Sequence, residues 1–214
     1  MPKKAGIVTM IAGAVLIFAA LSLFLYNKYE NAQAGQAAEN LLQDVQSAIE
    51  ETTSAPSEPR ELESSEPLDS SMTVVEIDGY GYIGYLSIPD LSLELPIMDQ
   101  WDYTRMKIAP CRHFGSTKTD DLVIAGHNYA SHFGTLRTLK PGARVNFTDM
   151  DGVEHNYEVI YLDTLAPTEV EAVQDSGYDL VLYTCTPGGK TRETVFCNRV
   201  LINQDTDTIP KDLD

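Results

Sequence analysis

The feature that most constrains the fold of this chain is an uncharged apolar run close to its amino terminus. Residues 7–26 read IVTMIAGAVLIFAALSLFLY, about 20 residues, which is the length that a helix needs to cross a lipid bilayer. Lys3 and Lys4 precede the run, and the positive-inside rule places such an end in the cytoplasm. The sequence therefore predicts a cytoplasmic amino terminus over residues 1–6, a single-pass anchor in the cell membrane over residues 7–26, and an extracellular location for everything after it.

A cleaved signal peptide is the alternative interpretation of the same segment. Ala32, Gln33 and Ala34 resemble the small-residue motif at which signal peptides are cut. The apolar run is longer than the core of a signal peptide, which has about 7 to 15 residues, and polar residues separate it from that motif. We therefore favour a retained anchor.

A spacer is expected to follow the anchor over residues 27–71. Its first part carries Leu42, Val45 and Ile49 at the spacing of one helix face, but this stripe is too short to fold alone. Residues 52–71 are rich in Ser, Pro and Glu, a composition that buries too little apolar surface to offset the entropy of ordering. The sequence thus predicts a helical and disordered extracellular spacer that ends in a flexible stalk.

The remaining residues, 72–214, are predicted to form one mainly β domain. Residues 142–167, for example, read as a hairpin in which a DMDG turn joins two alternating strands. Short strands at near-regular spacing, with only brief helical segments, are typical of a closed or partly closed β-barrel. The net charge of −17 and the lack of Lys and Arg clusters argue against nucleic acid as a partner.

Three cysteines lie in this domain, and an odd number outside the cell leaves at least one thiol unpaired. Cys197 falls inside an apolar strand pattern, where a small packed side chain is expected, and Cys111 lies in an irregular stretch without a role. Cys185 ends the run LVLYTC, and only Thr186 separates it from a Pro-Gly-Gly break. A side chain at such a strand end can face a cleft on a rigid support, so Cys185 is the candidate nucleophile.

A nucleophilic thiol needs a base or an electropositive neighbour, because the thiolate is the reactive form. His127 ends the buried run VIAGH with a Gly-His step, and this mirrors the strand-end placement of Cys185. The other histidines, His113, His132 and His155, occur in contexts that are typical of ordinary surface or core residues. His127 is therefore the candidate partner of the thiol.

These motifs resemble those of the sortases, the membrane-anchored cysteine transpeptidases of Gram-positive bacteria. The resemblance covers residues 82–202: IGYLSIPDLSLELPI is similar to the opening strand pair of the family, AGHN to its histidine strand and LVLYTCTP to its TLxTC signature. It implies a sortase-like closed β-barrel in which Cys185, His127 and an arginine act together. Arg192 and Arg199 are the two candidates for the arginine, and the family spacing favours Arg192.

The resemblance also implies the chemistry and the partners. Cys185 would attack a peptide carbonyl of an LPXTG-like sorting motif, His127 would protonate the departing amine, and Arg192 would hydrogen-bond the developing oxyanion. Thr184 of the signature is expected to contact the substrate. The expected partners are surface proteins or pilins that carry the motif, and an amine acceptor that is either a cell-wall precursor or a pilin lysine.

No cofactor is expected. Asp120, Asp121, Glu169 and Glu171 lie where some class A sortases bind calcium. Acidic loop residues in so negative a chain are usually just solvated, so the sequence predicts no metal site.

The class of sortase and the fate of the acyl group stay open. Residues 168–179 are too few for the long helix of class B enzymes, no Asp-Pro-aromatic lid of class C precedes Met72, yet TCTP followed by glycine resembles class C more than class A. The alternatives are a secreted cysteine protease that hydrolyses rather than transfers, and a catalytically silent membrane-tethered adhesin or scaffold. The presence of a nucleophile, a base and an arginine argues against the silent scaffold.

Overall fold

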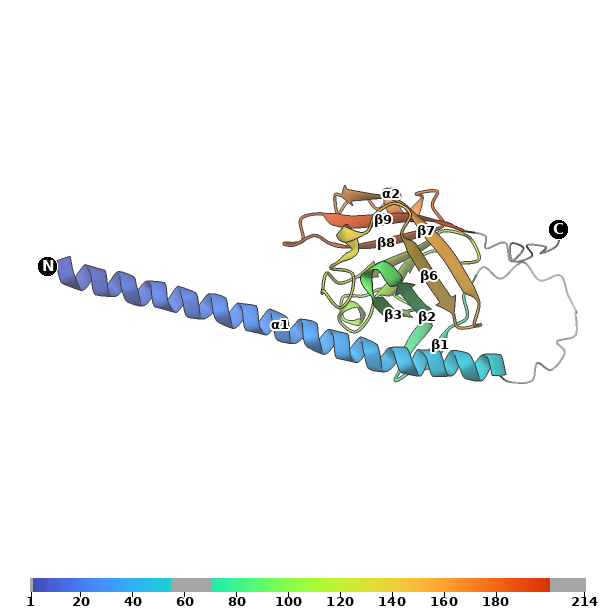
Figure 1. Ribbon diagram of the computed structural model, residues 1–214, viewed down its shortest axis with the longest axis horizontal. Helices are drawn as coiled ribbons and strands as arrows, with labels where there is room; N and C mark the ends of the chain where they lie inside the picture. Colours follow the sequence, from blue (N-terminus) through green and yellow to red (C-terminus); the bar gives the residue numbers. More distant parts are fainter. Residues whose placement is uncertain (1, 55–70, 201–214) are drawn as a thin grey trace, which may run out of the picture.

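The computed structural model describes residues 2–54 and 71–200, with side chains from Gly6 onward in the first of these segments. One long helix, α1 (Pro2–Ser54), precedes a domain built of short strands (Figure 1). The strands are β1 (Val75–Ile77), β2 (Tyr80–Ile88), β3 (Leu93–Met98), β4 (Cys111–Phe114), β5 (Leu122–Gly126), β6 (Arg144–Asp149), β7 (Glu154–Leu165), β8 (Leu180–Cys185) and β9 (Arg192–Arg199). The other helical segments are α2 (Glu171–Gln174) and the 3-10 turns η1 (Pro89–Leu91), η2 (Arg105–Lys107) and η3 (Leu136–Thr138).

The strands of the described segments form a closed barrel. Their hydrogen-bonded order is β1-β2-β3-β4-β5-β8-β9-β7-β6, and β2 also pairs with β6, so the sheet from β2 to β9 closes on itself. β1 extends the barrel by pairing with β2 alone. Most neighbours are antiparallel, but β3 runs parallel to β4, and β5 runs parallel to β8. The mainly β fold and the closed barrel that the sequence predicts are thereby confirmed.

The central strands β5 and β8 are covered on both faces. Leu122 and Leu182 point into the main core inside the barrel, whereas Val123 and Val181 pack with Val173 of α2 on the outside. Strands covered on both faces read as continuous apolar runs rather than alternating ones, as these two do. This buried pair forms a rigid support for the residues at its carboxyl end.

Two further expectations for the barrel can be compared with the structure. The hairpin expected over residues 142–167 forms β6 and β7, and its turn is closed by a hydrogen bond of 3.0 Å from Gly152 N to Asp149 O. Cys111 does not lie in an irregular stretch: it begins β4, pairs with Ala125 and is fully buried.

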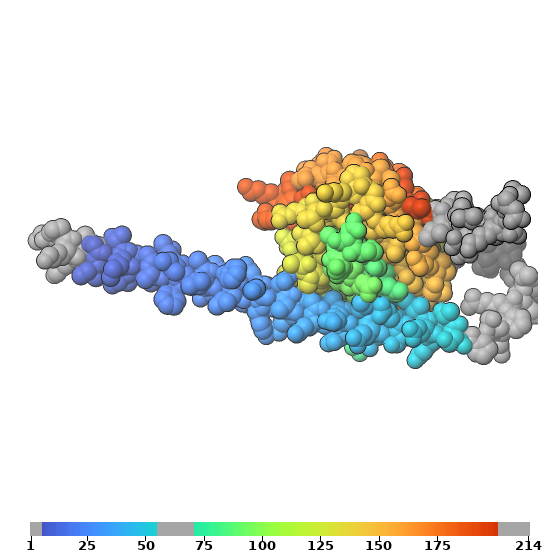
Figure 2. Space-filling view, viewed as in Figure 1, coloured from blue at the N-terminus to red at the C-terminus, as the bar shows by residue number. Residues whose placement is uncertain are grey.

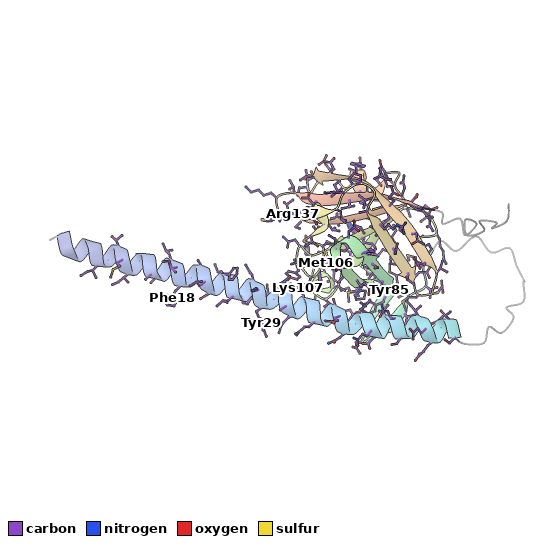
Figure 3. All side chains as sticks on the ribbon, viewed as in Figure 1. Phe18, Tyr29, Tyr85, Met106, Lys107 and Arg137 are labelled. Carbon is purple, nitrogen blue, oxygen red and sulfur yellow. The ribbon has the colours of Figure 1, made fainter. Side chains whose placement is uncertain are left out.

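α1 is one continuous helix whose two halves have different surroundings (Figure 2). Its first half stands clear of the barrel, where apolar side chains such as Phe18, 72% exposed, project outward (Figure 3). Within the described residues, Gly6–Ser54 is the segment long and apolar enough to cross a membrane, which makes α1 a candidate membrane anchor. Its second half lies along β1, β2 and β3, and buries Leu42, Val45 and Ile49.

This packing corrects the expected spacer. The apolar stripe of α1 is too short to fold alone, but it does not have to, because it packs against Tyr82, Met98 and Met150 of the barrel domain. The second half of α1 therefore belongs to the folded domain rather than to a loose tether. Most of the stalk predicted over residues 52–71 lies outside the described residues, and so does the carboxyl-terminal end from residue 201.

Candidate active site

Three neighbouring strands end at one edge of the barrel, and each presents a residue that the sequence singles out. β5 and β8 run parallel with Gly126 paired to Thr184, so His127 follows one strand where Cys185 ends the other. β9 returns antiparallel and begins at Arg192, which pairs directly with Cys185. The barrel thus brings His127 to the hairpin that carries Cys185 and Arg192, although His127 lies far from both in the sequence.

The local sequence explains how these strands end. Gly126 leaves room for Phe133, since a Cβ at this position would lie 2.5 Å from the Phe133 ring. The chain after β5 folds back through a hydrogen bond of 3.1 Å from Phe133 N to His127 O. At the end of β8, Gly188 and Gly189 have φ of +88° and +72°, a region that favours glycine, and they turn the chain into β9.

The His127 ring is half-buried and stacks on Tyr129, with ring centroids 4.5 Å apart and planes 14° from parallel. Burial lowers the pKa of His127 from its usual 6.5, and a hydrogen bond with Asn128 opposes this shift. The neutral ring, which can accept a proton from a thiol, is therefore favoured. No hydrogen bond joins His127 to Cys185 within the described segments, and such contacts are often long in free enzymes.

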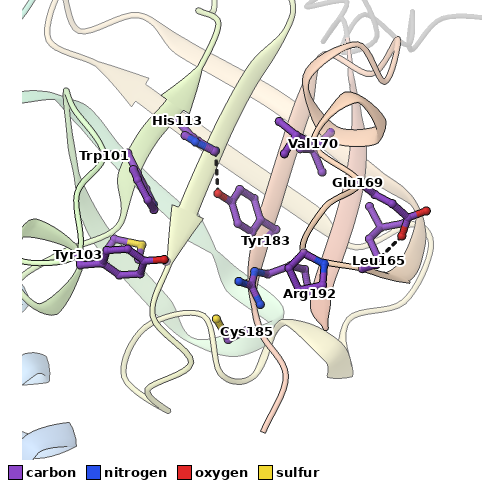
Figure 4. A pocket seen from close by; sticks show the side chains of 14 residues that line it. Trp101, Tyr103, His113, Leu165, Glu169, Val170, Tyr183, Cys185 and Arg192 are labelled. Atoms are coloured by element: carbon purple, nitrogen blue, oxygen red, sulfur yellow. Dashed lines mark hydrogen bonds between the residues drawn. The ribbon is translucent and has the colours of Figure 1, made fainter. Parts of the chain in front are cut away.

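The Arg192 guanidinium lies beside Cys185 at the end of the strand pair (Figure 4). Its Nη1 donates to the carbonyl oxygens of Gly189, at 3.2 Å, and Thr191, at 3.1 Å. Arginine stays charged and carries five N–H donors in a fixed fork, so donors remain for a further acceptor. Arg192 is therefore placed to hydrogen-bond an oxyanion that forms at Cys185.

Arg199, the other arginine considered from the sequence, ends β9 at the opposite end of the strand. Its Nη2 donates to Asp120 Oδ1 at 2.6 Å and to Thr117 O at 2.7 Å, and its Nη1 lies 2.8 Å from His155 Nδ1. Arg199 thus joins three segments of the barrel. Of these two arginines, it is Arg192 that lies next to the thiol.

Cys185 and Arg192 open onto an apolar hollow with a volume of about 200 Å³ (Figure 4). One wall is aromatic and includes Trp101 and Tyr103, which follow β3. The opposite wall comes from the chain after β7 and includes Val170. An apolar groove with a few polar groups at one end is the usual form of a binding site for a small or extended ligand.

Sequence reasoning missed several residues of this hollow. His113, expected to be an ordinary residue, lines it, and the Tyr183 hydroxyl lies 2.7 Å from His113 Nδ1. The Trp101 ring packs on His113 with centroids 5.0 Å apart, and burial lowers the pKa of His113. Strand alternation could have found Tyr183, which precedes Cys185 by two residues and shares its face. His113 and Trp101 come from distant segments, and no local pattern marks them.

A second hollow, of about 180 Å³, also reaches Cys185 and is lined by Asn128, Arg137 and Pro187 among others. Thr184, expected to contact the substrate, belongs to this lining but is only 3% exposed. Its hydroxyl has no hydrogen-bond partner in the part of the chain that the structure describes. The contact of Thr184 with substrate stays a prediction.

The two other thiols line neither hollow. None of the three cysteines is paired in a disulfide within the described residues. Burial raises the pKa of Cys111 to about 12 and also raises the pKa of Cys197. Both thiols therefore stay protonated, whereas Cys185 is partly exposed at the strand end.

The acidic residues considered for calcium are spread over separate elements. Asp120 is paired with Arg199, and Asp121 accepts a hydrogen bond from the backbone of the loop that precedes it. Glu169 lies at the rim of the first hollow, and Glu171 begins α2. The described residues hold no group of three or more His, Cys, Asp or Glu placed to share a metal ion.

The family model described as "Sortase domain" matches residues 86–202. Sortase A of Bacillus anthracis is 29% identical over 115 residues, which are 51% of this chain and 54% of that protein. The chain therefore aligns with about half the length of this curated relative.

Solved structures share the fold of the barrel. The sortase D5 transpeptidase of Clostridium perfringens superposes with a TM-score of 0.57 at 14% identity, covering 78% of this chain and 99% of that one. A lid mutant of sortase A from Corynebacterium diphtheriae gives 0.52 at 22% identity, with 79% and 98% covered. Sortase C1 from Streptococcus suis gives 0.51 at 24% identity, with 58% and 76% covered. At these identities the likeness concerns the fold alone.

Proposed function

This chain belongs to the sortase family, and from that premise we propose that it is a membrane-anchored cysteine transpeptidase with Cys185, His127 and Arg192 as its catalytic residues. One observation carries the proposal: the register of β5, β8 and β9 puts these residues at one strand edge, where an apolar hollow opens. A thiol, a base and a fixed cation at such an edge are the parts that acyl transfer through a thioester needs.

The reaction follows from these positions. The Cys185 thiol gives its proton to His127, and its sulfur forms a bond with the scissile carbonyl carbon. Arg192 hydrogen-bonds the oxyanion of the tetrahedral intermediate. The bond from carbon to nitrogen then breaks, His127 returns the proton to the departing amine, and a thioester remains on Cys185. An incoming amine attacks the thioester and loses a proton to His127, and the bond from carbon to sulfur breaks as the new amide forms. The departing thiolate then takes the proton from His127, which restores the free enzyme.

The shape of the hollow supports a sorting motif of the LPXTG type as substrate. Leucine and proline side chains are apolar and fit between Trp101 and Val170, while the scissile carbonyl reaches Cys185 at the end of the hollow. The donors would be surface proteins or pilins that carry the motif. The acceptor would be an amine of a cell-wall precursor or a pilin lysine.

Mass spectrometry of the intact chain tests this proposal. The full-length protein in detergent is incubated with LPXTG-like peptides, and the mass of the chain should rise by the amino-terminal part of the peptide while the carboxyl-terminal fragment is released. Adding candidate amines should then yield the new amide. A released free acid at saturating amine would identify a hydrolase instead, and a chain that forms no adduct with any peptide would fit a silent scaffold.

We also propose that α1 crosses the cell membrane with the barrel outside. The exposed apolar side chains of its first half and the preceding Lys3 and Lys4 support this orientation. Protease added to intact protoplasts should remove the barrel. Survival of the full-length chain under that treatment, with cleavage only after lysis, would show the opposite orientation.

A further inference from the structure

A second contact between α1 and the barrel lies at the loop that follows His127, close to the candidate active site. Ser131 Oγ donates to the backbone oxygen of Asn31 at 3.1 Å, and Ser131 N donates to Asn31 Oδ1 at 3.4 Å. Gly35, one turn further along α1, allows this approach, since a Cβ there would lie 3.0 Å from Ser131 Cβ. The anchor helix and the loop are thus hydrogen-bonded and in close contact.

A row of aromatic rings connects this contact to the His127 imidazole. His132 is completely buried next to the backbone of Ala34 in α1. Its ring meets Tyr129 edge to face, with centroids 5.5 Å apart, and Tyr129 in turn stacks on His127. Because packed rings constrain one another's orientation, a displacement of α1 is transmitted to the His127 ring.

His127 depends on this row because little else orients its ring. A catalytic base is normally held by a third group that hydrogen-bonds it. In the described part of the chain no carboxylate is hydrogen-bonded to the ring, although the Glu30 carboxylate of α1 acts on it electrostatically. The ring stacks on Tyr129 and is hydrogen-bonded with Asn128. The Asn128 side chain is itself exposed and gives weak support.

We propose that α1 positions the catalytic imidazole. Asn31 and Gly35 act through Ser131, and Ala34 acts through His132 and Tyr129. All of these are positioning residues, since none of them touches the reacting atoms. Turnover therefore depends on the anchor helix being docked on the barrel. This inference rests on the proposed function, in which His127 carries the proton.

Steady-state kinetics of the full chain in detergent micelles provide the first test. Gly35→Leu forces Ser131 away from α1 and should lower kcat about 10- to 100-fold with KM unchanged, the scale of a misplaced catalytic group. Gln43→Leu, which puts the same side chain on an exposed position of α1, should match the wild type. Equal kcat values for these two variants would overturn the proposal.

The aromatic row gives a second pair of variants that leaves α1 intact. Tyr129→Leu removes the stacking partner of His127 and should lower kcat to a similar extent, while Tyr129→Phe keeps the ring and should restore turnover. If Gly35→Leu does not fold, this pair still tests the contact between the Tyr129 ring and His127, on which the proposal depends. A phenylalanine variant as slow as the leucine variant would contradict positioning by the ring.

A spectroscopic measurement separates this inference from the proposed function. In a chain labelled with ¹³C at histidine Cε1, the signal of His127 is identified by its loss in His127→Gln. It should shift or broaden in Gly35→Leu and Tyr129→Leu but not in Gln43→Leu, while the signal of distant His155 stays fixed. An unmoved His127 signal overturns positioning. A moved signal with unchanged kcat also overturns the proposal, because turnover then does not depend on the orientation of the ring. Loss of turnover in His127→Gln would separately keep the catalytic role of His127.

Discussion

Cys185 and Arg192 face each other across β8 and β9, so that the last residue of one strand is paired with the first residue of the next. The turn between them contains two glycines with positive φ, which close it without strain. Strand pairing therefore fixes the distance between the thiol and the cation, and neither side chain needs to be recruited from a mobile segment.

The first prediction concerns the three thiols. Cys185→Ala should abolish the covalent adduct with a sorting-motif peptide, because it removes the only partly exposed thiol among the described residues. Cys111→Ala and Cys197→Ala should still form the adduct, since these thiols are buried and their pKa values are raised. Intact-mass spectrometry of each variant measures the outcome, and an adduct on Cys185→Ala would refute the assignment.

The second prediction concerns the arginine. Arg192→Ala should lower turnover on the order of 10²-fold or more, the usual cost of removing a donor to an oxyanion. Arg192→Lys should remain impaired, because a lysine lacks the fixed fork of donors. Arg144→Ala, at the exposed start of β6, is the matched control and should keep wild-type turnover. Similar rates for the two alanine variants would exclude Arg192 from the reaction.

The third prediction concerns acid stability. Burial lowers the pKa of His132 from 6.5 to about 4, so between these values the unfolded chain binds a proton that the folded chain does not. Acid therefore favours unfolding. The free energy of unfolding keeps its full value above about pH 6.5 and decreases as the pH falls toward 4. The loss should be about 3 kcal/mol.

His132→Leu isolates this effect. Denaturant unfolding of the variant and the wild type in detergent should show a smaller decrease in the free energy of unfolding between pH 7 and pH 4 for the variant. The difference between the two decreases is the contribution of His132, because the other histidines are unchanged. Identical decreases would mean that His132 is protonated without penalty in the folded chain.

The fourth prediction concerns the domain boundary. A chain that starts at residue 28 keeps the docked half of α1, whereas one that starts at residue 72 exposes the surface that Leu42, Val45 and Ile49 cover. The shorter chain should lose about 5 kcal/mol of stability for three such side chains. Thermal unfolding of the two soluble chains measures this difference. Equal unfolding temperatures for the two chains would place the domain boundary at Met72, as the sequence predicts.

The barrel and the strand-end residues could be predicted because their signals are local. An apolar run that stops at a glycine marks the end of β5, and a run that stops shortly before a Pro-Gly-Gly break marks the end of β8. A histidine or cysteine at such an end stands out from its neighbours. The structure shows why both runs matter together: the two strands are parallel neighbours, so their ends meet.

The partner of the apolar stripe on α1 could not be predicted. The sequence shows Val45 and Ile49 on one helix face, but an apolar stripe does not identify the surface against which it packs. That surface is formed by Tyr82, Met98 and Met150, which come from three separate parts of the barrel domain. The contact of Asn31 with Ser131 could not be predicted either, because no sequence pattern links a serine in a polar loop to a helix residue a hundred positions earlier.

The continuity of α1 determines how the enzyme meets its reactants. The apolar run ends at Tyr26 and Asn31 is hydrogen-bonded to the barrel, so about 8 Å of helix separates these two residues at 1.5 Å per residue. The loop between β8 and β9 projects toward the amino-terminal side of α1 (Figure 1). If residues 7–26 occupy a bilayer, as we propose, the reaction is confined to a thin layer above the lipid. Donor and acceptor that are themselves tethered to that bilayer then find the thiol by lateral diffusion, a search in two dimensions at high effective concentration.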